Sequence, residues 1–380
     1  MSTSTAPPTS IYEQLGITPV INARGNNTVL GGSTPSPRVR RAMQEVERYY
    51  VDMQQLLERS GAVIADLLGA EAAYVTPGAA AALALGTAAC MAGADPDKMG
   101  RLPDTTGMPG TVLIQAGHRY HYERAVTVPG GRLVEVGDAN GTTAAQLEAA
   151  LGPTTATVFF PAHLDGAPGT LPLREVLAIA HAHAIPVLVD AAGRVYPLDK
   201  FRSYTRAGAD LVAFGAKYLG ALNASGILCG RADLVQAAAL HGFIGFETAA
   251  WEKSFGRPLK LDRQTIVAVV TALQEWLETD HDARLASYDR RLKAIANELE
   301  GAQGVTLSFV HGDGAAPRVL RLAFDPALSR HDATGVVNGL LSGAPAIAVG
   351  RDGDAITINP VTLREEDDGL VASRLGQLLL

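Results

Sequence analysis

The sequence predicts an α/β protein with a mostly parallel sheet covered by helices on both faces, followed by a smaller α+β domain. The main observation is that short apolar runs alternate with amphipathic helical patterns from residue 72 to residue 230, which is typical of βαβ units. The length of 380 residues suits two domains. An apolar fraction of 47% with 19% charged residues provides a core and excludes a wholly disordered chain.

The N-terminal region is expected to contain a tail, an irregular arm and a helix. Residues 1–10, MSTSTAPPTS, lack the basic and apolar regions of a secretion signal, so we expect a frayed terminus. The arm contains PVINARGNNTVLGGS. From residue 34 to residue 68 apolar side chains recur at helical spacing, and Gly69 is a suitable helix end.

Six apolar runs are the expected strands of the large sheet, and a seventh strand-like run, AAYV, precedes them. Residues 78–93 form the most membrane-like stretch, but they fall short of the roughly 20 residues of a membrane span and are mostly alanine. We therefore expect a buried helix and no membrane partner. The six runs are Thr111–Gln115, Leu133–Val136, Ala156–Phe160, Pro186–Asp190, Asp210–Phe214 and Gly226–Cys229.

The last third of the chain predicts the small domain. A helical pattern runs from residue 262 to residue 299, and such a long helix commonly bridges two domains. The run RVLRLAF, a helix around 332–341, the hairpin pattern AIAVGRDGDAITINP and a final helix follow. We predict that residues 1–50 are an arm and first helix contributing to the small domain, 51–260 the large α/β domain, and 261–380 the bridging helix and small α+β domain.

Charge and motifs exclude several classes of function. The formal net charge of −7 and the isoelectric point near 5.7 argue against nucleic acid as a partner. Two cysteines are too few for a disulfide scaffold, and a reducing cytoplasmic compartment fits them. The sequence contains neither a P-loop nor the G-x-G-x-x-G fingerprint. No cysteine or carboxylate cluster accompanies its histidines, so we predict no metal site.

Two features indicate an anion site and an acid at the sheet edge. Gly78, Ala79 and Ala80 open a helix directly after a strand, and the free N–H groups of such a turn bind a phosphate without side-chain obstruction. Asp190 ends the run PVLVD, where an acid points into the ligand crevice of α/β folds. The alternatives are simple helix packing for the first feature and a helix-capping aspartate for the second.

Lys217 is the third feature. Arginines outnumber lysines 26 to 6, and five of the lysines lie in loops or on polar helix faces. Lys217 instead lies between two apolar runs, beside Gly215. Desolvation there would lower its pKa and make its amine nucleophilic toward a carbonyl.

An anion cradle, an acid and a buried lysine are what pyridoxal 5′-phosphate requires, because they anchor its phosphate, keep its pyridine nitrogen protonated and form a Schiff base. A ring above the cofactor normally completes the set. His118 is our prediction for that ring and His121 the second choice, although each could be an ordinary surface histidine.

The chain resembles fold type I pyridoxal-phosphate enzymes with the aspartate aminotransferase-like fold, in the group that contains selenocysteine synthase and D-glucosaminate-6-phosphate ammonia lyase. The matching pieces occur in the expected order over nearly the whole length. They are YEQLGITPVINARGNNTVLGGS, TPGAAAALALGTAACMAG, GHRYHYERAV, VLVDAAG, DLVAFGAKYLG with SGILCGR, GRPLKLDRQTIVAVVTAL and INPVTL. The resemblance implies a homodimer or higher assembly, with active sites at the subunit interface and Lys217 carrying the cofactor.

The chain departs from the pattern of this group at the lysine. Members usually read Ser-Gly-Gly-Lys followed by Gly-Pro-Gln, whereas this chain has Phe-Gly-Ala-Lys217 followed by Ala-Leu-Asn223. The missing serine removes one expected phosphate ligand, and the altered loop with Asn223 is expected to shape the substrate pocket. The acidic charge, and the lack of a basic N-terminal domain, disfavour selenium transfer to tRNA.

The predicted reaction is α,β-elimination from an amino acid, giving a 2-oxo acid and ammonia, with Lys217 as the base. A substrate carboxylate calls for an arginine, and Arg24 and Arg351 are candidates. Arg257 is expected to reach the phosphate in a neighbouring subunit. Racemase, aldolase and aminotransferase activities remain alternatives, as does a non-catalytic metabolite-binding protein.

Overall fold

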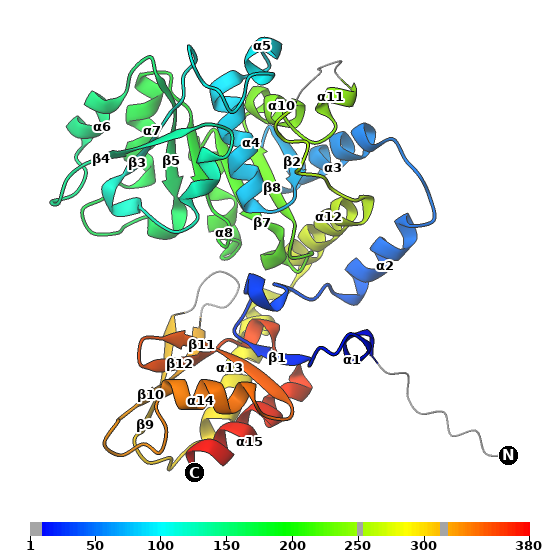
Figure 1. The fold of residues 1–380 in the computed structure, drawn as a ribbon, viewed down its shortest axis with the longest axis vertical. Coiled ribbons are helices and arrows are strands. Elements are labelled where there is room, and N and C mark those ends of the chain that lie inside the picture. Colours follow the sequence, from blue (N-terminus) through cyan, green and yellow to red (C-terminus); the bar gives the residue numbers. More distant parts are fainter. Residues whose placement is uncertain (1–9, 249–253, 312–317) are drawn as a thin grey trace. The chain divides into compact units, whose positions relative to one another are not determined.

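The computed structural model of the chain describes residues 10–248, 254–311 and 318–380. These residues form two compact units (Figure 1). The large unit is Ser33–Thr279, and the small unit combines the N-terminal segment ending at Gly32 with Asp280–Leu380.

A seven-stranded sheet forms the centre of the large unit. Its strand order is β2-β8-β7-β6-β5-β3-β4, in which β8 alone runs antiparallel to its neighbours. Every residue of β3, β5, β6, β7 and β8 is buried, as expected for a sheet covered on both faces. The predicted fold class is therefore confirmed. The strands are β2 (Ala72–Thr76), β3 (Thr111–Gln115), β4 (Arg132–Val136), β5 (Thr155–Pro161), β6 (Val187–Asp190), β7 (Leu211–Gly215) and β8 (Gly226–Gly230).

The helices of the large unit cover this sheet, and α4 lies closest to its centre. Helix α4 contacts β5, β6, β7 and β8 and is buried over most of its length. None of the helices among the described residues is long and apolar enough to cross a membrane. The helices are α2 (Pro37–Val46), α3 (Met53–Leu68), α4 (Ala79–Ala92), α5 (Pro96–Met99), α6 (Ala144–Ala150), α7 (Leu173–Ala182), α8 (Leu198–Phe201), α9 (Ser203–Arg206), α10 (Ala232–Leu240), α11 (Gly245–Thr248) and α12 (Arg263–Glu278).

Two helical patterns that the sequence presents as continuous are each divided by an N-cap. The first is divided before α3, because the Asp52 side chain accepts a hydrogen bond from the Gln55 N–H. Gly69 ends α3 in the left-handed conformation, as predicted. The second is divided into α12 and α13 (His281–Asn297), because Asp280 accepts from the Ala283 N–H. The two units meet in sequence at this second break.

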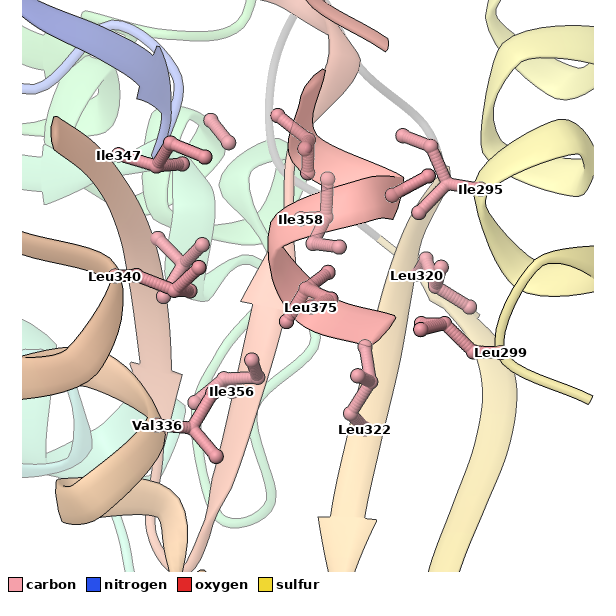
Figure 2. Close-up of a cluster of buried hydrophobic side chains, with 14 of the residues drawn as sticks. Ile295, Leu299, Leu320, Leu322, Val336, Leu340, Ile347, Ile356, Ile358 and Leu375 are labelled. Atoms are coloured by element: carbon pink, nitrogen blue, oxygen red, sulfur yellow. The ribbon is translucent and has the colours of Figure 1, made fainter. Parts of the chain in front are cut away.

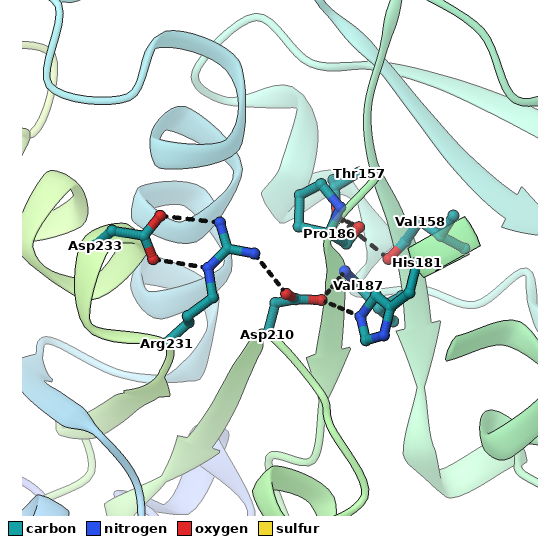
Figure 3. A network of polar contacts seen from close by, with 8 residues as sticks. All are labelled: Thr157, Val158, His181, Pro186, Val187, Asp210, Arg231 and Asp233. Carbon is teal, nitrogen blue, oxygen red and sulfur yellow. Dashed lines mark hydrogen bonds and ion pairs between the residues drawn. The ribbon is translucent and has the colours of Figure 1, made fainter. Parts of the chain in front are cut away.

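A polar network joins the amino-terminal ends of β6 and β7 (Figure 3). The Asp210 carboxylate is almost fully buried. It accepts hydrogen bonds from Arg231 Nη1 at 2.8 Å, His181 Nε2 at 2.9 Å and the Val187 N–H at 2.8 Å. Asp233 holds the same guanidinium at 2.7 Å. Because all of these donors converge on one buried carboxylate, the starts of neighbouring strands are fixed to each other.

The small unit has a five-stranded sheet in the order β1-β11-β12-β10-β9, in which β1 is parallel to β11 and the other pairs are antiparallel. Apolar side chains from α13, α14, α15 and this sheet form its core (Figure 2). The predicted hairpin pattern is β11 and β12. The elements are α1 (Ile11–Gln14), β1 (Val20–Ala23), β9 (Val305–His311), β10 (Arg318–Phe324), α14 (Ala333–Leu341), β11 (Ala346–Asp352), β12 (Ala355–Ile358) and α15 (Asp368–Leu379).

Candidate active site

The start of α4 is an uncapped helix N-terminus with small side chains. Gly78 is the N-cap, at φ 107°, and no side chain among the described residues caps the helix there. Strand β8 passes so close that a Cβ on Gly226 would lie 2.5 Å from the Gly78 carbonyl carbon and 2.8 Å from the Ala79 nitrogen. The first N–H groups of α4 have no partner within the helix, so they can bind an anion.

Asp190, the last residue of β6, is buried with 6% of its surface exposed. One carboxylate oxygen, Oδ1, accepts the Ala192 N–H at 3.0 Å, and the other, Oδ2, accepts the hydroxyl of Tyr120. Burial raises the pKa of Asp190, and these two hydrogen bonds act against that rise. The next helix begins only at Leu198, with Pro197 as its N-cap. Asp190 therefore caps no helix, which removes one of the two interpretations from sequence.

Lys217 lies on the 3₁₀ turn Ala216–Leu219, directly after β7. Its side chain is partly buried, and desolvation lowers its pKa. The Nζ atom lies 5.3 Å from the centre of the Tyr218 ring. That ring packs on two glycines, since a Cβ on Gly215 would lie 3.1 Å from it and a Cβ on Gly193 3.5 Å. The Tyr218 ring thus lies beside the lysine amine and packs against both glycines.

These three features meet at one edge of the sheet. Asp190 pairs with Ala213 of β7, and the Gly215 N–H donates to the Ala192 carbonyl, so the acid and Lys217 follow neighbouring parallel strands. Gly226 begins β8, which is the next strand, and it contacts the start of α4. The carboxyl edge of parallel strands is where α/β folds bind ligands.

The other lysines of the described ranges have ordinary surroundings. Lys98 lies 3.4 Å from Asp95, and Lys200 lies 3.6 Å from Asp165. Lys260 and Lys293 are exposed. Lys253 lies outside the described residues.

His118 is fully buried, and Gln115 Nε2 lies 3.3 Å from its Nδ1. Its ring meets Phe160 edge-on at 4.8 Å, and burial lowers its pKa to about 4. Phe159 and Phe160 are adjacent in β5 and point to opposite faces of the sheet. Tyr120 stacks on Phe159 at 6.1 Å and bonds Asp190. The ring that the structure brings to the acid is therefore that of Tyr120, while His121 is exposed.

The departures from the family pattern have a structural basis at position 214. Phe214 is 1% exposed, and its ring meets that of Phe201 edge-on at 4.7 Å. This side chain fills the core of the large unit and offers no polar atom to a phosphate. Asn223, in the loop after the lysine, has a buried Oδ1 with no hydrogen-bond partner among the described residues.

The three predicted arginines each have a hydrogen-bond partner in the protein. Arg257 donates to the Phe243 carbonyl at 3.4 Å and lies 3.7 Å from Glu247. In the small unit, Arg24 is exposed and its N–H donates to Asn22 Oδ1 at 2.9 Å. Arg351 is exposed on β11, and its Nε donates to the Gly353 carbonyl at 3.1 Å. Their roles toward a substrate or phosphate stay predictions.

Sequence reasoning missed Tyr120 and Tyr218. Tyr218 adjoins the lysine in sequence, so its proximity was available. Tyr120 lies in the segment GHRYHYERAV, which contains three aromatic or imidazole rings besides His118. Nothing in the local pattern says which of them reaches a carboxylate 70 residues away.

Comparison with known proteins gives consistent matches. A family model described as L-seryl-tRNA selenium transferase (SelA) matches residues 20–303. A 5′-C-glycyluridine monooxygenase-decarboxylase of Streptomyces is 34% identical, over 97% of this chain and 92% of that protein. The D-glucosaminate-6-phosphate ammonia lyase of Salmonella typhimurium is 28% identical, over 97% and 98%. A selenium transferase of Moorella thermoacetica is 27% identical, and the match covers 64% of that longer protein.

Solved structures agree with these matches. A D-glucosaminate-6-phosphate ammonia-lyase structure superposes with a TM-score of 0.85 at 27% identity, covering 98% of this chain and 99% of the other. An aspartate aminotransferase of Thermus thermophilus superposes with a TM-score of 0.53 at 16% identity, over 99% and 98% of the two chains. The second comparison supports the fold alone.

Proposed function

The chain belongs to the L-seryl-tRNA selenium transferase (SelA) family of pyridoxal-phosphate-dependent enzymes, and we propose that it is a lyase that converts an amino acid to a 2-oxo acid and ammonia. The observation that carries the proposal is that Asp190, Lys217 and the uncapped start of α4 share one sheet edge. Relatives and structures with ammonia-lyase names support the same reaction.

The residues present fit the cofactor. The N–H groups of Ala79 and Ala80 would hold its phosphate, at a helix start so close to β8 that a Cβ on Gly226 would clash with its backbone. Asp190 would pair with its pyridine nitrogen, and Lys217 would carry it as a Schiff base. When bound, the cofactor supplies an electron sink for charge that develops at the substrate Cα.

The chain's own groups supply the proton chemistry. Lys217 would become a free amine once the substrate's amine has replaced it, and its lowered pKa favours the neutral form, which can take the proton from Cα. Loss of water across Cα and Cβ gives an enamine. The enamine tautomerises to an imine, and water returns to release ammonia. The net reaction of a β-hydroxy amino acid therefore yields one 2-oxo acid and one ammonia, with no external oxidant.

The names of the relatives support a substrate class. In seryl, glucosaminate and C-glycyluridine groups, the carbon that bears the amine adjoins a carbon that bears oxygen. We therefore propose α-amino acids with an oxygen substituent on Cβ as substrates. Phe214, where a serine is usual in the family, offers no side-chain ligand to the phosphate.

A second reaction has specific support, because the 34% identical relative is named a monooxygenase-decarboxylase. Such a reaction would consume oxygen and release carbon dioxide from the substrate carboxylate. The lyase reaction does neither. The two candidates start from the same Cα chemistry and differ in what the assay must detect.

The testing experiment mixes the holoprotein with D- and L-amino acids, including β-hydroxy amino acids. It follows ammonia, 2-oxo acid, oxygen, carbon dioxide, aldehyde and the enantiomer. Ammonia and 2-oxo acid in equal amounts, without an amino acceptor or oxygen uptake, support the lyase. Oxygen uptake together with carbon dioxide release would instead support the monooxygenase-decarboxylase reaction. Aldehyde, racemised substrate or a need for an amino acceptor indicates an aldolase, racemase or aminotransferase.

Lys217→Ala is the matching variant, and the exposed Lys260→Ala is its control. We expect Lys217→Ala to lose the visible absorbance of the bound cofactor and all turnover, and Lys260→Ala to keep both. If Lys217→Ala kept the visible absorbance of the cofactor, the cofactor would not be attached to Lys217, and a non-catalytic binding role would be favoured.

We further propose that the enzyme is a cytoplasmic homodimer or higher homo-oligomer. Helix α1 supports assembly, because Ile11, Tyr12 and Leu15 are each more than half exposed although a capping box between Ser10 and Glu13 specifies the helix. The two free cysteines suit a reducing compartment. Light scattering of the purified protein measures the assembly directly, and a monomer would refute it.

A further inference from the structure

Tyr120 reaches the Asp190 carboxylate from two strands away. It follows β3, while Asp190 ends β6, and β5 lies between them in the sheet. Its ring stacks on Phe159 of β5 at 6.1 Å, with 28° between the planes. It also meets the His163 ring edge-on at 4.8 Å. Packing against these two rings therefore orients Tyr120, whose hydroxyl donates to the carboxylate.

Charged groups fix the loop that carries Tyr120. The Tyr120 N–H donates to Glu123 Oε2 at 3.1 Å. Arg119 Nε donates to the two oxygens of Glu123 at 2.9 and 2.8 Å, and its Nη1 donates to Glu135 at 2.8 Å. Glu123 is almost fully buried, at 7% exposure. The Arg119–Glu135 ion pair thus holds this loop against β4, while the two contacts to Glu123 fix the loop internally.

The hydroxyl and the carboxylate influence each other. Burial raises the pKa of Asp190, whereas the hydrogen bond from Tyr120 lowers it. Burial and the nearby carboxylate raise the pKa of Tyr120, so it stays a donor at every physiological pH. The charge of His163 also lowers the pKa of Asp190, and Lys217 follows the adjacent strand β7. Tyr120 is therefore a neutral side-chain donor that, together with the Ala192 N–H, offsets the desolvation of the acid.

We propose that Tyr120 is a positioning residue that orients the Asp190 carboxylate and keeps it ionised for the pyridine nitrogen of the cofactor. The inference rests on the proposed function, since it requires the cofactor at this edge. It assigns a role to a hydroxyl that touches the acid and not the reacting atoms.

Tyr120→Phe tests the inference, because it removes the hydroxyl and keeps the ring that stacks on Phe159. The control is Tyr122→Phe, which removes a hydroxyl two residues away from a side chain that is 74% exposed. The measurement is the dissociation constant of pyridoxal phosphate for the apoprotein between pH 5.5 and 9. Thermal unfolding of each apoprotein confirms that the variants fold.

We expect Tyr120→Phe to bind the cofactor about ten- to a hundredfold more weakly near pH 7, the range for losing a hydrogen bond to a charged group. The pH below which affinity falls should move up by about one unit. In an Asp190→Ala background the same change should have no further effect, because the carboxylate through which it acts is gone. Tyr122→Phe should match the wild type.

Two results would overturn the inference. One is a Tyr120→Phe pH profile that coincides with that of the wild type. The other is an equal loss of affinity at every pH and in the Asp190→Ala background, which is what a purely structural role gives. Failure of the proposed function is distinct, because the wild type would then bind no cofactor or would keep its absorbance after Lys217→Ala.

Discussion

Gly226→Ala should damage both the large unit and its phosphate cradle. The added Cβ would lie 2.5 Å from the Gly78 carbonyl carbon and 2.8 Å from the Ala79 nitrogen, whereas non-bonded carbon atoms separate by about 3.5–4 Å. Both neighbours are backbone atoms, so either β8 or the start of α4 must move by about 1 Å. Overpacking of this kind costs about 1–3 kcal/mol.

The same displacement moves the N–H groups of Ala79 and Ala80 away from a bound phosphate. Loss of one such hydrogen bond to a charged group weakens binding about tenfold or more. We therefore expect Gly226→Ala to melt several degrees lower and to bind pyridoxal phosphate at least tenfold more weakly, both measured on the apoprotein. Titration at low temperature keeps the variant folded while affinity is measured.

Gly152→Ala is the matched control, because no atom lies within 4 Å of its added Cβ and its φ is not positive. It should keep the wild-type affinity and melt at the same temperature or slightly higher. A Gly226→Ala protein with wild-type melting and wild-type affinity would refute the close approach of β8 to α4. Lower melting with unchanged affinity would place the phosphate elsewhere.

Three further predictions follow from buried groups. Arg231→Leu removes a donor from a buried carboxylate and should lower the free energy of unfolding by about 1.5–3 kcal/mol in urea titrations, whereas Asp233→Asn, at an exposed carboxylate, should change it by less than about 1 kcal/mol. Burial lowers the pKa of His241 to about 4, below its unfolded value near 6.5, so the unfolded chain binds the extra proton. Stability should therefore fall as the pH decreases from 6.5 to 4, and His241→Gln should reduce that slope in urea titrations at several pH values; an unchanged slope would contradict the assignment. Phe214→Ser opens a cavity in the core, so it should lower the free energy of unfolding by about 3–5 kcal/mol by the same titration, and an unchanged free energy of unfolding would contradict the core role of Phe214.

The fold was predictable because its signals are local and repeated. The strands of the large sheet are four to seven residues long and mostly apolar, because burial of both faces of a sheet favours apolar side chains. The helix ends were less predictable, because a side chain such as Asp52 or Asp280 reads as a polar residue within a helical pattern until its cap hydrogen bond is known. Strand order also lay beyond the sequence, since pairing depends on contacts across the whole unit.

The site divides in the same way. Asp190 and Lys217 could be proposed from sequence because Asp190 ends one apolar run and Lys217 follows another, and strand ends of a parallel sheet meet at one edge. Tyr120 could not, because its contact depends on a loop held by Arg119 and on the position of β5 between its own strand and β6. His118 lies on the 3₁₀ turn that follows β3, and its ring meets Phe160, whereas the Tyr120 ring stacks on Phe159.

The departure at Phe214 connects these observations to the chemistry of the site. With a buried phenylalanine where the family has serine, the end of β7 contributes no hydroxyl to a phosphate from that position. The anion must then depend more on the backbone N–H groups at the start of α4. Strand β8 passes so close to this helix start that no side chain fits at Gly226. A backbone cradle holds the phosphate by geometry, so the cofactor's affinity in this chain should respond more to small displacements of α4 than to exchange of nearby polar side chains.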